Sequence, residues 1–437
     1  MEFVLLLLNR VVFGGAILSI FFLTKFNKNK SVKFSDLFGS YLGFFTFGMF
    51  VVHSFIPVIQ LIYPQFNRLS NYSFEDSTYS VLFCVLYYLT FLITYVSLTR
   101  FLKIKNSSVD IDSIDTSKVS CLLFLVTMPA TLSVFFIVKI ITQSNFAELL
   151  INRIELFRGL GGVLLLSNLF IFIGLFLFAN YLKSRKFKFI FLYFIVVFFM
   201  LILFTAIGSR NSFFIFLITN LCFFSILGGG LTFRKLIFYT SIFLVFFTFV
   251  GLVRMRVDNI EEVNLFSSLF ENIAHSLISV FGTDEMFRFL LEKEFVDWQF
   301  GSTFLAGVTN FIPRGIWLDK PFGAGPLLTN FISPGSYGLK QSGLSSYTTG
   351  IIAESYMNFG ILSLIVIAPL NAFIGVLIDK IKVKSFYSLC LKSYFLVIFG
   401  FALFYSEFLG LLARGLYVGF PIIVSLIIVE KLTLGRK

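Results

Sequence analysis

The stretch FIFLYFIVVFFMLILFTAI, residues 189–207, decides the fold class of this chain. It carries no charged side chain over 19 consecutive residues. An α-helix rises about 1.5 Å per residue, so a run of this length reaches across most of the roughly 30 Å hydrocarbon core of a bilayer. The strands of a membrane barrel would instead be alternating segments of about ten residues. The stretch therefore predicts a transmembrane helix.

Similar runs recur from one end of the chain to the other. Of its 437 residues, 57% are hydrophobic and only 13% are charged. Soluble domains contain about 25% charged residues, so the composition excludes an ordinary soluble enzyme, a disordered chain and a fibrous protein. We expect an all-α polytopic membrane protein with about eleven transmembrane helices, within a range of ten to twelve. The predicted spans are residues 3–24, 37–63, 78–99, 119–142, 161–182, 189–207, 212–231, 235–253, 349–376, 386–405 and 415–430.

Motifs for nucleotide-driven transport and for zinc chemistry are missing from the sequence. We find no HExxH motif, no Walker A loop and no GxGxxG after a strand pattern. The four cysteines (Cys84, Cys121, Cys222 and Cys390) all lie in apolar runs and lack CxxC spacing. We therefore interpret them as small core residues, and not as a disulfide framework or a metal site.

The basic residues indicate the orientation of the predicted spans. Alternate loops contain 20 of the 35 lysines and arginines, of which 16 are lysine. By the positive-inside rule these loops are cytoplasmic, which places the N-terminus outside and the C-terminus inside. The opposite loops contain twelve basic residues, nine of them arginine. Arginine recognises phosphate or carboxylate by two parallel hydrogen bonds, so we interpret the outer face as one that handles an anion. Chance in a small sample is the alternative. The net charge of +12 follows mainly from the cytoplasmic lysines and does not indicate nucleic-acid binding.

One long polar connection divides the chain into three segments. A first bundle of about eight spans (residues 1–253) precedes a large extracytoplasmic loop (254–348), and a C-terminal bundle of about three spans follows (349–437). The first half of the loop has apolar residues at helical spacing between Leu265 and Phe281, with Glu271 and His275 on the opposite face. This pattern predicts an amphipathic helix on the outer membrane surface, ending before Gly282.

The second half of the loop is rich in glycine and proline. Residues 296–350 hold nine of the 31 glycines and four of the nine prolines, with aromatic residues between them. This density indicates a specifically turned loop. Aromatic faces beside hydroxyl, amide and carboxylate groups suit a sugar ring, although aromatic residues also anchor loops at a membrane interface.

Two groups of ionisable residues are candidates for chemistry. Glu354 lies about one turn inside an apolar span and His275 lies in the amphipathic helix, so each is a candidate proton acceptor. The alternatives are a carboxylate placed at a helix N-terminus and an ordinary surface histidine. Arginines at predicted outer helix ends and in the loop form the second group. Taken singly, such an arginine is more commonly an interface anchor, but we interpret the set as a pyrophosphate site. They are Arg210, Arg254, Arg256, Arg314 and Arg414.

Three stretches in this order resemble a known family. They are Gly208-Ser209-Arg210, the loop segment NFIPRGIWLDKP (residues 310–321) and ESYMNFG (residues 354–360). Together with the many spans and the single large outer loop, they resemble the Wzy-type polymerases of oligosaccharide repeat units. The expected outer N-terminus and the count of eleven spans differ from the topology given for many members of that family, in which both ends lie inside.

The resemblance implies a GT-C-like glycosyltransferase of the bacterial plasma (inner) membrane, with its active site on the outer face. Donor and acceptor would be polyprenyl-pyrophosphate-linked glycans, and the chain would build O-antigen, capsule or exopolysaccharide with inversion at the anomeric carbon. It implies no bound metal or cofactor, and a possible chain-length regulator as a protein partner. The resembling stretches give the expected sugar-binding residues, which are Trp317, Asp319, Tyr356 and Asn358.

Three other functions remain open from the sequence. An O-antigen ligase of the same class would need a histidine in the large loop, and His275 is the one available. A flippase or other transporter of lipid-linked oligosaccharides would need polar residues deep in many spans, where we find only Arg10, Lys139 and Lys392. A structural scaffold would need neither the outer arginines nor the turned loop.

Overall fold

The computed structural model describes residues 2–25, 38–69, 73–103, 169–207, 210–227, 269–295, 297–312, 314–336, 347–383 and 386–413, with a few isolated positions besides. Every regular element in these ranges is a helix, and they contain no strand. The predicted all-helical class is therefore confirmed for the described part of the chain.

Five of the described helices are long and apolar enough to cross a membrane, which agrees with a helical membrane protein. They are Glu2–Thr24, Tyr41–Ile62, Glu75–Phe101, Gly350–Asp379 and Ser388–Tyr405. Each coincides with a predicted span. Three further predicted spans coincide with shorter apolar helices, Leu169–Ser184, Phe187–Leu201 and Ile215–Ile226. Of the predicted spans 119–142, 235–253 and 415–430, the structure describes at most isolated positions.

The chain divides into two compact units that do not follow chain order. Unit 1 comprises Met1–Lys105, Leu269–Lys380 and Ile398–Ala413, and unit 2 comprises Asn106–Ser268, Ile381–Val397 and Arg414–Lys437. This division cuts across the three consecutive segments expected from the sequence. The first spans, the second part of the long loop and the Glu354 span thus fold together in unit 1.

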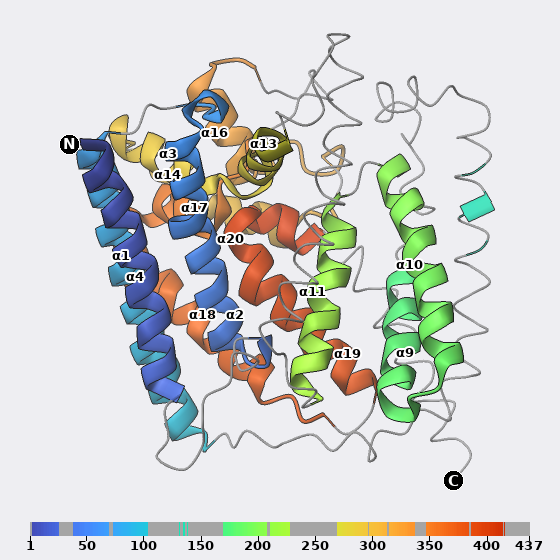
Figure 1. The fold of residues 1–437 in the computed structure, drawn as a ribbon. Helices are drawn as coiled ribbons and strands as arrows, with labels where there is room; N and C mark the ends of the chain where they lie inside the picture. The colour runs from blue at the N-terminus through green and yellow to red at the C-terminus, as the bar shows by residue number, and fades with distance from the viewer. Residues whose placement is uncertain are drawn as a thin grey trace. The chain divides into compact units, whose positions relative to one another are not determined.

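Unit 1 is built from long apolar helices and from the short helices of the loop (Figure 1). The N-terminal helices are α1 (Glu2–Lys25), α2 (Tyr41–Phe50), η2 (Val51–Phe55), α3 (Ile56–Ile62), η3 (Pro64–Phe66) and α4 (Phe74–Phe101). The loop contributes α13 (Leu269–Phe281), α14 (Thr283–Glu292), α15 (Ser302–Val308) and α16 (Ala324–Ile332). The C-terminal part adds α17 (Gly350–Phe359), η5 (Gly360–Leu362), α18 (Ser363–Asp379) and α20 (Leu403–Tyr405).

Unit 2 has described helices that pack through phenylalanine rings. These are α9 (Leu169–Ser184), α10 (Phe187–Ile207), α11 (Arg210–Ile226) and α19 (Phe386–Phe395). The following η6 (Leu396–Ala402) belongs to unit 1 from Ile398 on. Phe386 packs edge-on against Phe172, Phe176 and Phe223, with ring centroids 5.4–6.2 Å apart. Such edge-to-face pairs stabilise contacts between helices beyond the burial of their area.

Serine caps explain where two helices of unit 1 begin, and a glycine explains how closely two others pack. Ser40 begins α2 and Ser73 begins α4, each accepting a hydrogen bond from a backbone N–H three residues on, which satisfies an otherwise unpaired donor. α18 packs along α4, where Asn371 donates a hydrogen bond of 2.8 Å to the Tyr87 hydroxyl. Gly375 allows close contact with α2, since a Cβ there would lie 2.1 Å from the ring of Tyr41.

The predicted span 349–376 contains a break. α17 ends at Phe359, and Gly360 has φ +53°, a left-handed conformation that suits glycine. The ring of Trp298 lies where a Cβ of residue 360 would be, 2.9 Å from its position. The turn η5 then leads into α18. Backbone breaks inside membrane segments occur where protein, not lipid, surrounds them, and this break is covered by the long loop.

Candidate functional site

The long loop of unit 1 is a folded structure of short helices. α13 ends at Phe281 and α14 begins at Thr283, so the helix stop predicted at Gly282 is confirmed. Ala274, Leu277, Ile278 and Phe281 of α13 are buried. Phe270, which the predicted apolar stripe includes, is 71% exposed and is not part of the buried face. The amphipathic helix thus packs its second half into unit 1.

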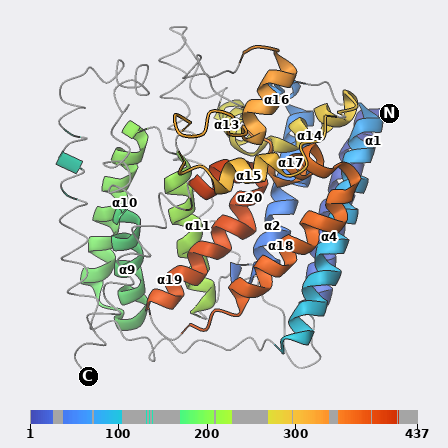
Figure 2. The same cartoon turned by 180° about the vertical axis from the view of Figure 1, so that it is seen from behind.

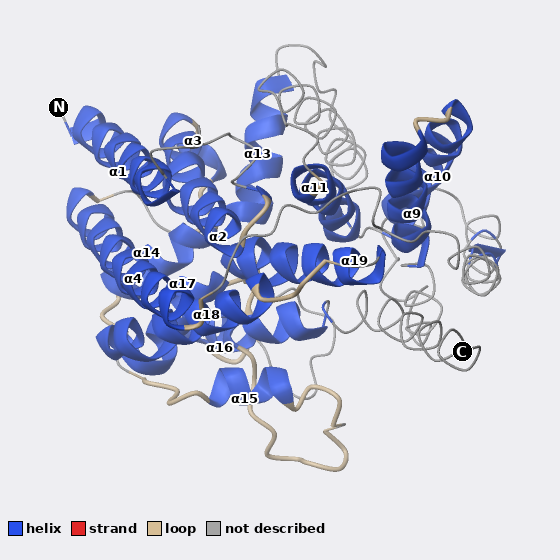
Figure 3. Cartoon of the chain, turned by 90° about the horizontal axis from the view of Figure 1, so that it is seen from below, coloured by secondary structure: helices blue, strands red, loops and turns tan. Residues whose placement is uncertain are grey.

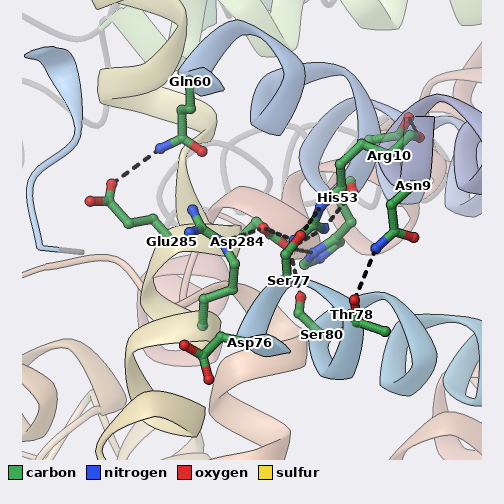
Figure 4. Close-up of polar contacts among 12 residues, drawn as sticks. Asn9, Arg10, His53, Gln60, Asp76, Ser77, Thr78, Ser80, Asp284 and Glu285 are labelled. Atoms are coloured by element: carbon green, nitrogen blue, oxygen red, sulfur yellow. Dashed lines mark hydrogen bonds and ion pairs between the residues drawn. The ribbon is translucent and has the colours of Figure 1, made fainter. Parts of the chain in front are cut away.

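Asp284 is the centre of a buried polar cluster that joins the loop to the first helices (Figure 4). Its carboxylate accepts hydrogen bonds from Arg10 Nη1 at 3.2 Å, His53 Nδ1 at 2.8 Å and Ser80 Oγ at 3.1 Å. Arg288, one turn further along α14, donates from Nε at 3.0 Å. The carboxylate of Asp284 is fully buried, and so is the guanidinium of Arg10. Four elements, α1, η2, α4 and α14, therefore meet at one carboxylate.

The charges around Asp284 keep it ionised. Burial alone would raise the pKa of its carboxyl, but Arg10, His53 and Arg288 outweigh that effect and hold the pKa well below its usual range. A hydrogen bond from Arg10 Nε to Ser77 Oγ at 3.2 Å and one from Nη1 to the carbonyl of His53 at 3.0 Å complete the cluster. Because the groups are paired and hydrogen-bonded, burial of these charges is tolerated.

The neighbouring carboxylate, Glu285, fixes a different part of unit 1. It accepts hydrogen bonds from the backbone N–H groups of Arg68 and Leu69, both at 2.6 Å, and from Gln60 Nε2 at 3.1 Å. Glu285 is 1% exposed. Asp284 and Glu285 thus lie in the first turn of α14, and Glu285 also binds the chain that follows α3. The carboxylates of Asp284 and Glu285 are thus both occupied by contacts within unit 1.

A second buried cluster joins the glycine-rich part of the loop to α17. Thr303 Oγ1 in α15 donates a hydrogen bond of 2.8 Å to Glu354 Oε1. Asn358 Nδ2 donates 2.7 Å to Thr303 Oγ1, and Asn358 Oδ1 accepts from the N–H of Gly301 at 2.9 Å. The N–H of Phe408 donates 2.6 Å to Glu354 Oε2. Glu354, Thr303 and Asn358 are all fully buried, so this cluster, which we call the Glu354 junction, holds three segments together.

Glu407, adjacent in sequence to Phe408, extends the junction to α16. Its Oε2 accepts a hydrogen bond of 2.5 Å from the N–H of Gly325, in the first turn of α16. A Cβ at Gly323 would lie 3.1 Å from the same oxygen, so glycine there gives the carboxylate room. Sequence reasoning missed Glu407. The signal was available, because it is an isolated carboxylate in an apolar run, the same feature that singled out Glu354.

Tyr356, a predicted sugar-binding residue, lies among other aromatic rings. Its ring contacts Phe83, Phe287 and Trp298 edge-on, with centroids 5.5–5.7 Å apart. Tyr356 is half-buried, while Asn358, the other predicted residue of α17, is fully buried in the junction. Trp298 was not predicted individually, although it is one of the aromatic residues of the 296–350 segment.

Trp317 and Asp319, the other predicted sugar-binding residues, lie in the turn between α15 and α16. Trp317 is half-buried and Asp319 is exposed. Arg314 shapes this turn: it donates hydrogen bonds to the carbonyls of Lys320 at 2.6 Å and Pro321 at 3.0 Å. Its guanidinium also lies 4.1 Å from the ring centroid of Phe322. The guanidinium of Arg314, which we predicted to bind an anion, thus contacts the carbonyls and the phenylalanine ring of its own turn.

The other predicted catalytic and arginine positions are described only in part. His275 is half-buried on α13, and its ring lies edge-on to Phe66 with centroids 5.2 Å apart. Arg210 begins α11 in unit 2, and its side chain is not described. Arg254, Arg256 and Arg414 lie outside the described residues.

His53, Cys84 and Asp284 are the described residues whose ligand atoms lie close enough to hold a metal ion. Their atoms are all within 4.8 Å of one another. The guanidinium groups of Arg10 and Arg288 bind the same carboxylate, however, and their positive charges repel a cation. We therefore interpret the cluster as a structural joint. His53 itself is buried, and its Nδ1 is hydrogen-bonded to Asp284.

Comparison of the chain with protein-family models, with curated proteins and with solved structures found no match in any of the three.

Proposed function

We propose that this chain is a membrane glycosyltransferase that joins polyprenyl-pyrophosphate-linked oligosaccharide repeat units on the outer leaflet of the bacterial plasma membrane. The observation that supports this most is the Glu354 junction. There the stretch ESYMNFG at one end of an apolar helix meets the turned loop that precedes NFIPRGIWLDKP. The fold would be of the GT-C type, with about eleven spans, and donor, acceptor and membrane lipids would be its partners.

The reaction needs one proton acceptor and one site for a departing anion. A hydroxyl of the acceptor sugar forms a bond to the anomeric carbon of the donor, and the bond from that carbon to the pyrophosphate breaks. The hydroxyl proton passes to a base, and polyprenyl pyrophosphate leaves with the bonding electrons. Preorganised arginines are suited to stabilise the charge that develops on the pyrophosphate. We assign this role to Arg210, Arg254, Arg256 and Arg414.

Glu354 is our first candidate for the base. In the structure both of its carboxylate oxygens accept hydrogen bonds, one from Thr303 and one from Phe408. Glu354 is also fully buried, so an acceptor sugar reaches its carboxylate only after the segments that cover it have moved. The loop around α15 therefore has to move during the cycle, as lids over active sites commonly do. His275 is the second candidate.

The turn that Arg314 closes supports the sugar-binding part of the proposal. Its two hydrogen bonds hold the 314–321 turn in one conformation, with Trp317 and Asp319 at its surface. An aromatic face beside a carboxylate in a preformed turn suits a saccharide. We therefore assign Arg314 to stabilising the turn. Binding of the pyrophosphate is left to Arg210, Arg254, Arg256 and Arg414.

The experiment that tests the function compares the lipid-linked glycans of a strain lacking this chain with those of strains that carry it. Single repeat units at the cell surface, with the ladder of longer chains restored by the wild type, would support a polymerase. Long chains accumulating on polyprenyl pyrophosphate would indicate a ligase instead. Repeat units retained at the cytoplasmic leaflet would indicate a flippase, and either result would overturn the proposal.

The arginine assignment has its own variants in the same strain. Arg254→Lys keeps the charge and loses two-point binding, so the ladder should shorten or disappear. Lys293→Arg, at an exposed ion pair with Glu292, is the matched exchange away from the junction and should leave the ladder unchanged. A wild-type ladder with Arg254→Lys would remove that residue from the pyrophosphate site.

A further inference from the structure

An exposed apolar face surrounds α15, and neither the Asp284 cluster nor the Glu354 junction uses it. Six large apolar side chains make up this face, each between 47% and 79% exposed. We call it the α15 face; its residues are Phe300, Leu305, Val308, Phe311, Ile316 and Leu318. An apolar patch that an extracytoplasmic loop leaves exposed to water would be unfavourable, and such patches mark contact with a partner or a membrane.

The opposite side of α15 is packed against protein, which fixes the direction of the face. Thr303, Ala306 and Gly307 are buried, and a Cβ at Gly307 would lie only 2.8 Å from the ring of Phe408. Leu305 and Val308, three residues apart, therefore lie on the outer side of this helix. Residues 301–313 contain no charged side chain, and the charged residues Arg314, Asp319 and Lys320 lie in the turn that also carries Ile316 and Leu318.

The position of α15 along the axis of the long helices of unit 1 places the α15 face beside the helices that could cross the membrane. Figure 2 shows α15 lying across the long helices, level with α17 and short of the N-terminal end of α1. Figure 3, seen along the long helices, shows α15 at the edge of the helices of unit 1. A helix at this depth and at this edge lies where the lipid of one leaflet would be.

The α15 face lies next to the exposed apolar side of a candidate membrane span. The N–H of Phe300 donates a hydrogen bond of 3.0 Å to the carbonyl of Asn358, so Phe300 lies beside the end of α17. Just beyond it, Ile361, Leu362 and Ile365 are 60–72% exposed. These three residues belong to the candidate membrane span Gly350–Asp379. The α15 face and these three residues therefore lie next to each other as exposed apolar surface.

We infer that the α15 face inserts into the acyl chains of the outer leaflet and holds the long loop of unit 1 on the membrane. Interfacial segments of this kind bury an apolar face a short way below the headgroups. Arg314 and Lys320 are held within the turn: Arg314 donates to the carbonyls of Lys320 and Pro321, and Lys320 Nζ donates a hydrogen bond of 3.0 Å to the carbonyl of Ile312. This inference concerns the loop's contact with lipid and does not depend on glycosyl transfer.

The test measures the surroundings of single positions in the full-length protein in lipid nanodiscs. Val308→Cys and Leu305→Cys each receive a nitroxide label in a background with Cys121→Ala, since Cys84, Cys222 and Cys390 are buried. Spin relaxation then compares collisions with oxygen, which concentrates in lipid, with collisions with a water-soluble nickel chelate. Glu294→Cys, an exposed polar position before the same loop, is the matched control.

We expect the ratio of oxygen to nickel collisions to be several-fold higher at residues 305 and 308 than at 294. High nickel accessibility at both positions would place the face in water and overturn the inference. Low accessibility to both reagents would mean that protein covers the face. Repeating the measurement with one chain per nanodisc would then distinguish a second copy of the chain from another part of the same chain, and either would also overturn it.

Discussion

Arg10 in the first helix and Asp284 in the long loop form a fully buried ion pair, with Arg10 Nη2 3.1 Å from Asp284 Oδ2. The two residues are 274 positions apart in the chain. The pair joins an apolar helix that crosses unit 1 to a loop that the sequence places outside the membrane. The loop is therefore anchored to the first helix by charge as well as by apolar packing.

Asp284→Asn should destabilise the protein strongly. The amide keeps the shape but leaves the charges of Arg10 and Arg288 buried without a carboxylate, and breaking a buried pair in this way costs about 3–5 kcal/mol. Thermal unfolding in nanodiscs, followed by the reaction of the buried cysteines with a thiol dye, would measure the loss. Glu292→Gln removes the exposed pair with Lys293 and should change stability by less than about 1 kcal/mol. Equal stabilities of the two variants would contradict the anchoring role.

The same cluster predicts a flat pH dependence near neutrality. The pKa of Asp284 is lowered in the folded protein, so its stabilising effect is complete above the unfolded-state value of about 3.9 and is lost only at more acid pH. The stability difference between wild type and Asp284→Asn should thus stay constant from about pH 5 to 8 and shrink at strongly acid pH. Unfolding temperatures of both proteins over this range would test it. A difference that changes between pH 6 and 8 would contradict this prediction.

Two variants at the Glu354 junction separate positioning from chemistry. Thr303→Val removes one hydrogen bond to Glu354 and leaves the hydroxyl-sized volume filled, which should cost about 1–3 kcal/mol of stability. If Glu354 is the base, Glu354→Gln should abolish polymerisation, while Thr303→Val should keep measurable activity. Ladder length and membrane abundance of each variant would be measured together. Similar activity losses in both variants, at normal abundance, would make Glu354 a positioning residue.

Gly350, at the start of α17, should not tolerate a side chain. Its φ is +66°, and a Cβ would lie 2.2 Å from the carbonyl oxygen of Phe404. Gly350→Ala should therefore cost about 2–4 kcal/mol through left-handed strain and displaced packing. Gly15→Ala is the control, because no atom lies within 4 Å of its Cβ and a helical alanine is favoured by about 0.5–1 kcal/mol. Unfolding temperatures should move in opposite directions, and a tolerated Gly350→Ala would contradict the close contact.

Much of the fold could be predicted, because apolar runs act locally. Five predicted spans coincide with long apolar helices, and the helix stop at Gly282 is confirmed. The break at Gly360 was not predicted, since the hydropathy of the 349–376 run is continuous across it. It arises where Trp298, from the distant loop, packs against a glycine with positive φ. Hydropathy reports transfer into lipid and carries no information on such contacts.

The candidate site was predictable only residue by residue. Glu354 stood out because a carboxylate in an apolar helix is costly and needs a reason. Its partners did not stand out: Thr303 is one hydroxyl among many, and the N–H of Phe408 has no sequence signal. Arg10 was noticed inside a span, but its counter-ion could not be chosen from among the carboxylates of the chain.

The sequence by itself determined that this is a helical membrane protein with a turned, aromatic loop, because helix length, hydropathy and turn residues are local properties. Only the tertiary structure decided which polar groups meet. Arg10 with Asp284, Thr303 with Glu354, and Glu407 with the first turn of α16 all join distant segments. A buried polar group must find a partner, but any complementary group can satisfy it. Which one does so is decided by how the helices pack.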